Sequence, residues 1–244
     1  MAFRNVLQVA LRCGHFKRHA IPMTTSLSPT PRSTVRRLKD RAQTDRAALY
    51  EVLDSAVVCN LAVVIDGAPV VLPTVYGRDG DTLYLHGSTG ALSLRTALQN
   101  EVSVAVTLVD GIVYARALMH FSMNYRSAVV HGMPRAVTGP DEVLHGLQVV
   151  VEHVAPGSWD TAREPNAKEL AATAVLALDL TEAAVKMRSG DPADDPEDVA
   201  AGGVWAGVIP MHQGWGEPIP SADLDDVPVP AHVAGRPGLT TAVR

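Results

Sequence analysis

The sequence predicts a mainly β protein with a few helices, folded as an antiparallel barrel. Successive β-rich runs are joined by Asp-Gly pairs at 66–67, 79–80 and 110–111, and this pair is a strong signal for a tight hairpin turn. Only short helices are expected between most of these runs. Both observations argue against a doubly wound sheet, in which strands and helices alternate.

The spacing of apolar residues places the individual elements. Apolar residues at helical intervals between 49 and 56 predict an amphipathic helix capped by Thr44, with Asp45 in its first turn. Strands are expected at 57–65, 69–76, 82–85, 102–109, 112–118, 127–137 and 173–180, with a further one at 204–209. A short helix is expected over 92–98, and the longest helix runs from Pro140 to the break at 156–157.

Composition and charge divide the chain into three parts. The 244 residues are 47% hydrophobic, enough to bury the core of one barrel domain, which we place at 44–210 with an acidic loop at 191–203. Residues 1–46 carry ten Lys or Arg against two Asp, so residues 1–43 are predicted to form a basic, disordered arm. A polar run opens at Met23, where we expect translation to start. Residues 211–244 are expected to be a disordered tail rich in Pro and Asp.

Several classes of protein are not supported by the sequence. Two cysteines cannot form a disulfide framework, which favours the reducing cytoplasm. No run of 18 apolar residues predicts a membrane span, and the basic arm lacks the aromatics of a nucleic-acid surface. The motifs of P-loop enzymes, serine hydrolases, zinc proteases and Rossmann dehydrogenases are missing.

Two segments carry candidate binding chemistry. The segment 86–90 (His-Gly-Ser-Thr-Gly) follows a strand and opens a short helix, so small residues let backbone N–H groups approach an anion; an ordinary helix cap is the alternative. Arg126 and Ser127 begin a strand, where a guanidinium suits a phosphate or a flavin edge; a surface arginine is the alternative. The spacing of His86, His120 and His131 is irregular and predicts no metal site.

A second copy of the chain is expected to cover part of the barrel. The runs 57–65 and 102–109 alternate weakly between polar and apolar residues, so both faces of these strands are apolar. The longest helix can cover only one face. A homodimer would cover the other.

In order and spacing, five segments resemble the pyridoxamine 5'-phosphate oxidase-related family of FMN-binding split barrels. The nearest branch contains nitroimidazole-resistance reductases and flavin-nucleotide-binding proteins, and the likeness covers about residues 44–210. The segments are 70–76 (Val-Val-Leu-Pro-Thr-Val-Tyr), 83–88, 100–104, 124–127 and 205–210 (Trp-Ala-Gly-Val-Ile-Pro). This resemblance implies an antiparallel split β-barrel that forms a homodimer with FMN at its interface.

The resemblance also implies which residues bind the cofactor. The backbone along the isoalloxazine would be that of Leu72, Pro73, Thr74 and Val75. The residues around the phosphate end would be His86, Gly87, Ser88 and Ser93. The strand that contacts the flavin would begin with Asn124, Tyr125, Arg126 and Ser127, and Trp205 would approach the flavin. No dedicated catalytic side chain is expected, because the flavin itself carries the chemistry.

The chain departs from authentic pyridoxamine-phosphate oxidases. Ala91-Leu92-Ser93 stands where those enzymes carry basic residues, and an acidic tail replaces their Arg-Leu-His-Asp-Arg segment. Leu92 also replaces the histidine of several nitroimidazole-resistance proteins. Two functions stay open: an FMN-dependent oxidoreductase acting on a small molecule with a donor such as NAD(P)H, or a non-catalytic protein that binds a flavin (FMN or FAD), a deazaflavin (F420) or haem.

Overall fold

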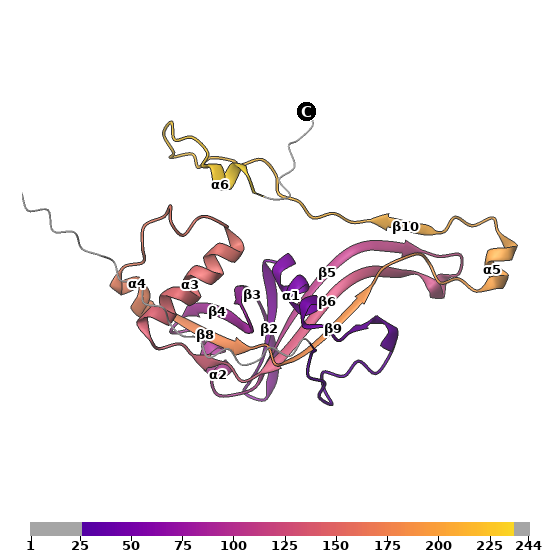
Figure 1. Ribbon diagram of the computed structural model, residues 1–244, viewed down its shortest axis with the longest axis horizontal. Helices are drawn as coiled ribbons and strands as arrows, with labels where there is room; N and C mark the ends of the chain where they lie inside the picture. The colour runs from indigo at the N-terminus through magenta and orange to yellow at the C-terminus, as the bar shows by residue number, and fades with distance from the viewer. Residues whose placement is uncertain (1–25, 237–244) are drawn as a thin grey trace, which may run out of the picture.

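The computed structural model describes residues 26–236 and contains one ten-stranded sheet in which every pairing is antiparallel (Figure 1). The strands are β1 Ala42–Gln43, β2 Val58–Ile65, β3 Ala68–Asp79, β4 Thr82–Ser88, β5 Val102–Tyr114, β6 Ser122–Gly132, β7 Arg135–Ala136, β8 Thr173–Asp179, β9 Glu182–Arg188 and β10 Gly207–Pro210. The helices are α1 Arg46–Ser55, α2 Leu92–Ala97, α3 Pro140–Val154, α4 Ala167–Ala172, α5 Pro196–Ala201 and α6 Ala231–Ala234, with 3-10 turns η1 Lys39–Arg41 and η2 Leu118–His120. The predicted mainly β, antiparallel architecture is confirmed.

The strand order brings distant parts of the chain together around one core. The sheet runs β1-β9-β6-β5-β2-β3-β4-β8-β7, and β10 pairs with β5. Alternate residues of β2 and β5 face the core, among them Cys59, Leu61, Val104 and Val106. Burial raises the pKa of the Cys59 thiol to about 12, so this cysteine is an inert core residue.

Two helices cover the sheet by different contacts. Leu49, Val52 and Leu53 of α1 are buried in the main core. The cap of α1 is Asp45 rather than the predicted Thr44: the Asp45 carboxylate accepts a hydrogen bond from Ala47 N at 2.9 Å, while the Thr44 carbonyl accepts one from Leu27 N. Helix α3 packs on β3, β4 and β8 and closes a second, smaller cluster. No helix within residues 26–236 has the length and apolar character needed to cross a membrane.

The strands at 102–132 differ from the prediction. The Asp110-Gly111 pair is not a turn: β5 continues to Tyr114 with an irregularity between Val109 and Gly111. Pairing along both edges holds it extended, because β6 lies on one side and β10 on the other. The true turn passes through η2, and β6 therefore begins at Ser122 rather than at 127. Strand β9, which pairs with β6, was not predicted.

The far ends of β5 and β6 form an arm with α5 and β10, here defined as residues 110–123 and 189–211. In Figure 1 the arm projects to the right, well beyond the barrel, and the chain after β10 returns over the barrel to α6. Large apolar side chains at the tip are open to solvent: Leu118 is 88% and Met119 91% exposed. A soluble chain seldom leaves such a patch uncovered without a binding role.

Residues 26–43, predicted as part of a disordered arm, lie against the barrel. Leu27 is buried in the main core, and β1 pairs with β9. Arg32 forms ion pairs with Glu101, which immediately precedes β5, and with Glu182, the first residue of β9. The charge of Arg32 is therefore matched by two carboxylates of the barrel domain, which composition alone does not reveal. Residues 1–25 of the predicted arm lie outside the described residues.

This packing predicts the outcome of two truncations. A protein starting at Met23 should unfold at the same urea concentration as the full chain, because it keeps every contact described above. A protein starting at Thr44 loses buried Leu27 and the β1 pairing, and should be less stable by about 3 kcal/mol or more, as for deletion of a core leucine. Urea unfolding followed by circular dichroism measures both, and equal midpoints for the two truncations would contradict this account.

Candidate cofactor site

The outward face of β2 and of the first half of β3 carries exposed valines, with the polar residue Asn60 among them. Residues that alternate with the core positions point outward, and Val58, Val64 and Val71 are 46%, 51% and 59% exposed. Antiparallel pairing places Val71 opposite Ala62 and Val58 opposite Val75. This set, Val58, Ala62, Val64 and Val71, is called the outer face below, whereas Val75 packs against the smaller cluster under α3.

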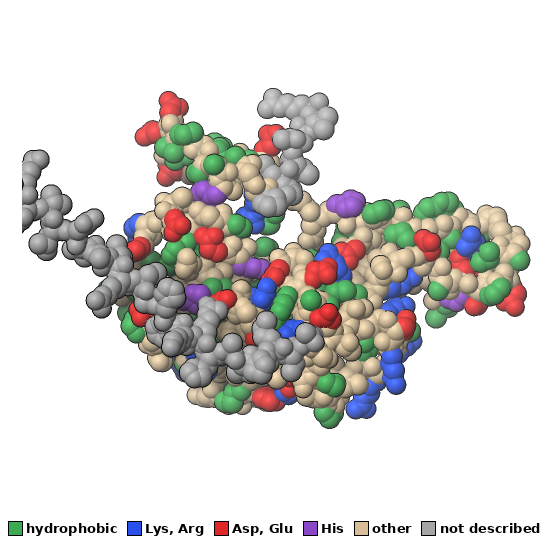
Figure 2. Space-filling model, in the orientation of Figure 1, with side chains coloured by type: hydrophobic (Ala, Val, Ile, Leu, Met, Phe, Trp, Pro, Cys, Tyr) green, Lys and Arg blue, Asp and Glu red, His purple; other side chains and the backbone are tan. Residues whose placement is uncertain are grey.

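A cleft of about 660 Å³ lies at one edge of the outer face. Its walls come from the end of α1 and start of β2, from β5, and from the segment after β10. The lining residues are Ser55, Ala56, Val57, Val58, Thr107, Leu108, His212, Gln213, Gly214 and Trp215. Figure 2 shows an opening between the C-terminal segment and the body of the barrel. The volume lies within the range of ordinary ligand sites, about 300–1,000 Å³.

Two of the predicted flavin segments flank this cleft. Strand β3 carries Leu72–Val75, which pairs with Val58–Leu61 of β2, so Val75 lies directly beside the cleft residue Val58. On the other side, Ser127 pairs with the cleft residue Thr107. Paired residues of neighbouring strands point to the same face, so Ser127 and Thr107 both face outward. The cleft thus lies between the two segments.

Arg126 points to the opposite face of β6 from Ser127, because successive residues alternate. Its guanidinium donates to both Asp110 oxygens, at 2.9 and 3.1 Å, and to Glu51 and Ser55 at 3.3 Å. These carboxylates raise the pKa of Arg126 and already balance its charge, the Asp110 hydrogen bond having the largest effect. Ser55, the last residue of α1, lines the cleft and accepts a hydrogen bond from Arg126, so Arg126 borders the cleft at the end of α1.

Asn124 and Tyr125 make their contacts with other parts of the protein. Asn124 is buried, donates to the Gly190 carbonyl at 3.2 Å and accepts a hydrogen bond from Arg188. Tyr125 pairs with Val109 on one side and Arg188 on the other. The contacts of Asn124 fix the start of the arm rather than the cleft.

The predicted phosphate end is a separate group at the end of β4. The loop amides are largely used within the protein: Gly90 N donates to Ser88 Oγ at 3.2 Å, and Thr89 N to the Ala172 carbonyl at 3.0 Å. His86 differs, since its Nδ1 is buried and has no hydrogen-bond partner among residues 26–236. Burial lowers the pKa of His86, so the ring is neutral at pH 7 and can donate one hydrogen bond.

The remaining residues of this group do not offer such an atom. A side chain at Gly87 would meet Leu94 at 2.7 Å, so glycine permits close packing of β4 on α2. Ser93 lies half-buried in the first turn of α2. An unpaired buried imidazole nitrogen is costly, and a bound oxyanion would satisfy it. His86 is therefore the strongest sign of a ligand at this end.

Trp205 and Trp215 lie in different places in the structure. Trp205 is 65% exposed on the arm and stacks edge-on against Tyr114, with ring centroids 5.7 Å apart. Trp215 lines the cleft, and the Arg236 guanidinium lies 3.8 Å from its ring centre. Sequence analysis placed Trp215 in a disordered tail. The run 212–216 contains a His and a Trp between glycines, and this was the signal in the sequence that could have indicated a binding segment.

The family model for pyridoxamine 5'-phosphate oxidase matches residues 45–187. Among solved structures, the flavocytochrome Anf3 from Azotobacter vinelandii is 33% identical with a TM-score of 0.81, covering 86% of this chain and 98% of that chain. The FAD and haem binding protein from Mycobacterium smegmatis is 37% identical with a TM-score of 0.77, covering 80% and 96%. No curated protein sequence matches this chain significantly. The split-barrel fold predicted from the sequence is confirmed by these neighbours.

Proposed function

This chain belongs to the pyridoxamine 5'-phosphate oxidase family, and we propose that it is a flavin- and haem-binding redox protein rather than a vitamin B6 oxidase. The observation that carries the proposal is the likeness, over most of both chains, to a flavocytochrome and to an FAD and haem binding protein. Both exceed 30% identity, and both cover more of this chain than the family model does. We infer that the flavin is FAD, in place of the FMN favoured by the sequence.

The cleft between the two flanking strand segments supports a ring-binding site. Its walls combine apolar Val57, Val58 and Leu108 with the aromatic face of Trp215, and a flat conjugated ring binds well to such a surface. Ser127 and Thr107 supply hydroxyl groups at its edge. When bound, a flavin supplies hydride or electron transfer, and the protein supplies position and polarity.

The buried Nδ1 of His86 supports binding of an oxyanion at the end of β4. A neutral imidazole donor is compatible with a phosphate oxygen, and the hydrogen bond would be charge-assisted by the phosphate. Asp110 and Glu51 form ion pairs with Arg126. We therefore propose that Arg126 helps to shape the cleft wall and does not neutralise the charge of the cofactor.

For haem, the residue that fits best is His212. It is exposed, lies on the cleft wall, and has a side chain able to ligate iron. Haem would supply one-electron chemistry. A flavin could pass electrons to it, because flavins transfer electrons singly or in pairs. We propose NAD(P)H as the electron donor and a small molecule as the acceptor.

We propose that the protein forms a homodimer through the outer face. Three valines about half exposed on neighbouring strands form an apolar surface that a second copy could cover. The arm projects away from its own barrel, and its exposed side chains Leu118, Met119 and Trp205 could contact the partner subunit. A two-fold partner could cover both surfaces at once.

The absorption spectrum of freshly purified, untagged protein tests the proposed cofactors. We expect flavin bands together with a Soret band, and FAD rather than FMN when the released flavin is separated by chromatography. Addition of NADH or NADPH without oxygen should bleach the flavin bands. Flavin bands without a Soret band would contradict the haem assignment. A colourless protein that binds neither group on reconstitution would contradict the whole proposal.

His86→Ala tests the oxyanion site. Loss of one hydrogen bond to a charged group, worth about 1.5–3 kcal/mol, should weaken flavin binding by roughly 10- to 100-fold. The matched control is His145→Gln on α3, whose ring contacts Asp79 at 2.9 Å and lies outside the cleft lining. Equal flavin affinity for both variants would remove His86 from the site.

A further inference from the structure

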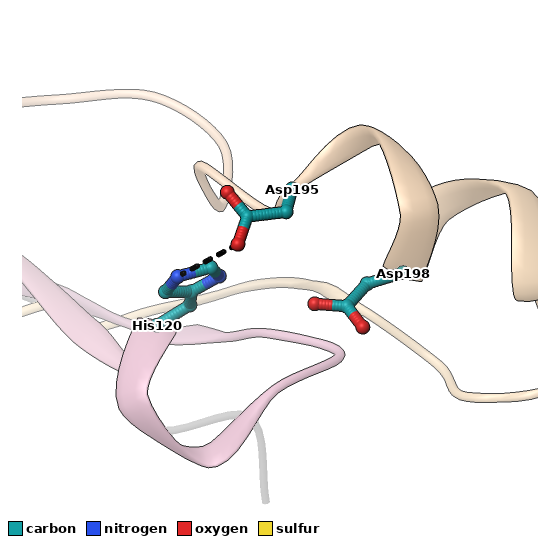
Figure 3. A group of neighbouring side chains, drawn as sticks. All are labelled: His120, Asp195 and Asp198. Carbon is teal, nitrogen blue, oxygen red and sulfur yellow. Dashed lines mark ion pairs between the residues drawn. The ribbon is translucent and has the colours of Figure 1, made fainter.

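His120, Asp195 and Asp198 converge at the tip of the arm. One ligand atom from each side chain lies within 4.8 Å of the others. His120 ends the turn between β5 and β6, whereas the two aspartates flank the start of α5, about 75 positions later in the chain. Figure 3 shows the imidazole and both carboxylates directed into a common space, with His120 and Asp195 forming an ion pair.

The imidazole separates this group from an ordinary cluster of surface carboxylates. His120 Nδ1 is buried and has no hydrogen-bond partner within residues 26–236. The nearest acceptors are too far for hydrogen bonds: Asp194 Oδ1 is 3.7 Å from Nδ1, and Asp195 Oδ2 is 3.8 Å from Nε2. Nδ1 lies toward Asp194, so Nε2, on the side of Asp195, is the nitrogen that would ligate an ion.

Behind the imidazole lies a fixed carboxylate. The Asp194 side chain is only 1% exposed, and it accepts hydrogen bonds from Arg116 N at 2.9 Å and from the Arg116 guanidinium at 2.7 Å. Ligating histidines commonly direct their second nitrogen toward such a carboxylate, which orients the ring and raises its basicity.

We propose that His120, Asp195 and Asp198 bind a divalent first-row metal ion, best represented by Zn²⁺, which fastens η2 to α5. One imidazole and two carboxylates suit zinc, leaving one position for water. Three aspartates against one arginine leave the group net negative, which favours a dication. In a tetrahedral site the ligand atoms lie about 3.4 Å apart, so small side-chain rotations would complete it. The sequence predicted no metal site because these ligands share no local motif.

Zinc titration of untagged, chelator-treated protein tests this site. Isothermal titration calorimetry should give one Zn²⁺ per chain with a Kd of roughly 10 µM or below, and Mg²⁺ should bind more weakly. His120→Ala should weaken zinc binding by about 100-fold and Asp198→Asn by about 10-fold or more. Glu197→Gln is the matched control, since this exposed α5 residue lies outside the group.

Thermal unfolding gives a second readout that does not depend on cofactor loading. Excess Zn²⁺ should raise the melting temperature of the wild type and of Glu197→Gln, but not that of His120→Ala. Circular dichroism confirms that each variant is folded before titration. Absence of a saturable zinc site, or equal zinc affinity in wild type and His120→Ala, would overturn the proposal.

Discussion

Replacing Gly77 with alanine is expected to destabilise the protein by about 3 kcal/mol, the upper end of the usual cost of overpacking. Gly77 lies on β3 beneath α3, and a Cβ there would stand 2.5 Å from the Val149 carbonyl oxygen and 2.8 Å from Val150 N. Both are backbone atoms of α3. No side-chain rotation can relieve the contact, so the helix must move off the sheet.

The movement of α3 would open the smaller of the two cores. That cluster joins Tyr84 and Val175 of the sheet to Val150 of the helix. Urea unfolding measures the loss, with Gly216→Ala as control, since nothing lies within 4 Å of a Cβ at that position and its effect should stay within about 0.5 kcal/mol. Equal stability of the two variants would mean that α3 is not seated on β3 as described.

Gly77 illustrates which parts of the fold the sequence could predict. Local patterns predicted α1, α3 and the hairpins at 66–67 and 79–80, because apolar spacing and Asp-Gly pairs act within a few residues. The same Asp-Gly signal failed at 110–111, where pairing of β5 with β6 and β10 overrides the local turn preference. The close approach of α3 to Gly77 is a tertiary contact, and the sequence has no local mark of it.

The candidate site divides in the same way. The resemblance to a known family directed attention to His86 and to strand β3, and the structure gives His86 an unpaired buried nitrogen. The resemblance could not reveal that Arg126 forms ion pairs with Asp110 and Glu51, since these partners come from β5 and α1. Trp215 and the metal-site candidate His120 depend on segments that meet only after folding.

The outer face provides the largest expected effect on function. Replacing Val58 with aspartate should weaken dimerisation by at least about 100-fold, because a carboxylate buried unpaired in an apolar interface costs several kcal/mol and two-fold symmetry introduces two of them. The isolated chain should still fold, since Val58 is 46% exposed and projects away from the core. Leu144→Asp is the control, because Leu144 is an exposed residue on α3 that belongs to neither the outer face nor the cleft lining.

Val58 also lines the cleft, so the same variant should lose most of its flavin. Light scattering and flavin titration on one sample separate the two effects. A monomer with weak flavin binding supports a cofactor site completed by the partner subunit. A stable dimer without flavin would keep the cleft as the binding site but would contradict the interface at the outer face. A stable dimer with full flavin binding would contradict both proposals. The two measurements therefore decide whether the apolar face of β2 and β3 binds a second copy, a cofactor, or both.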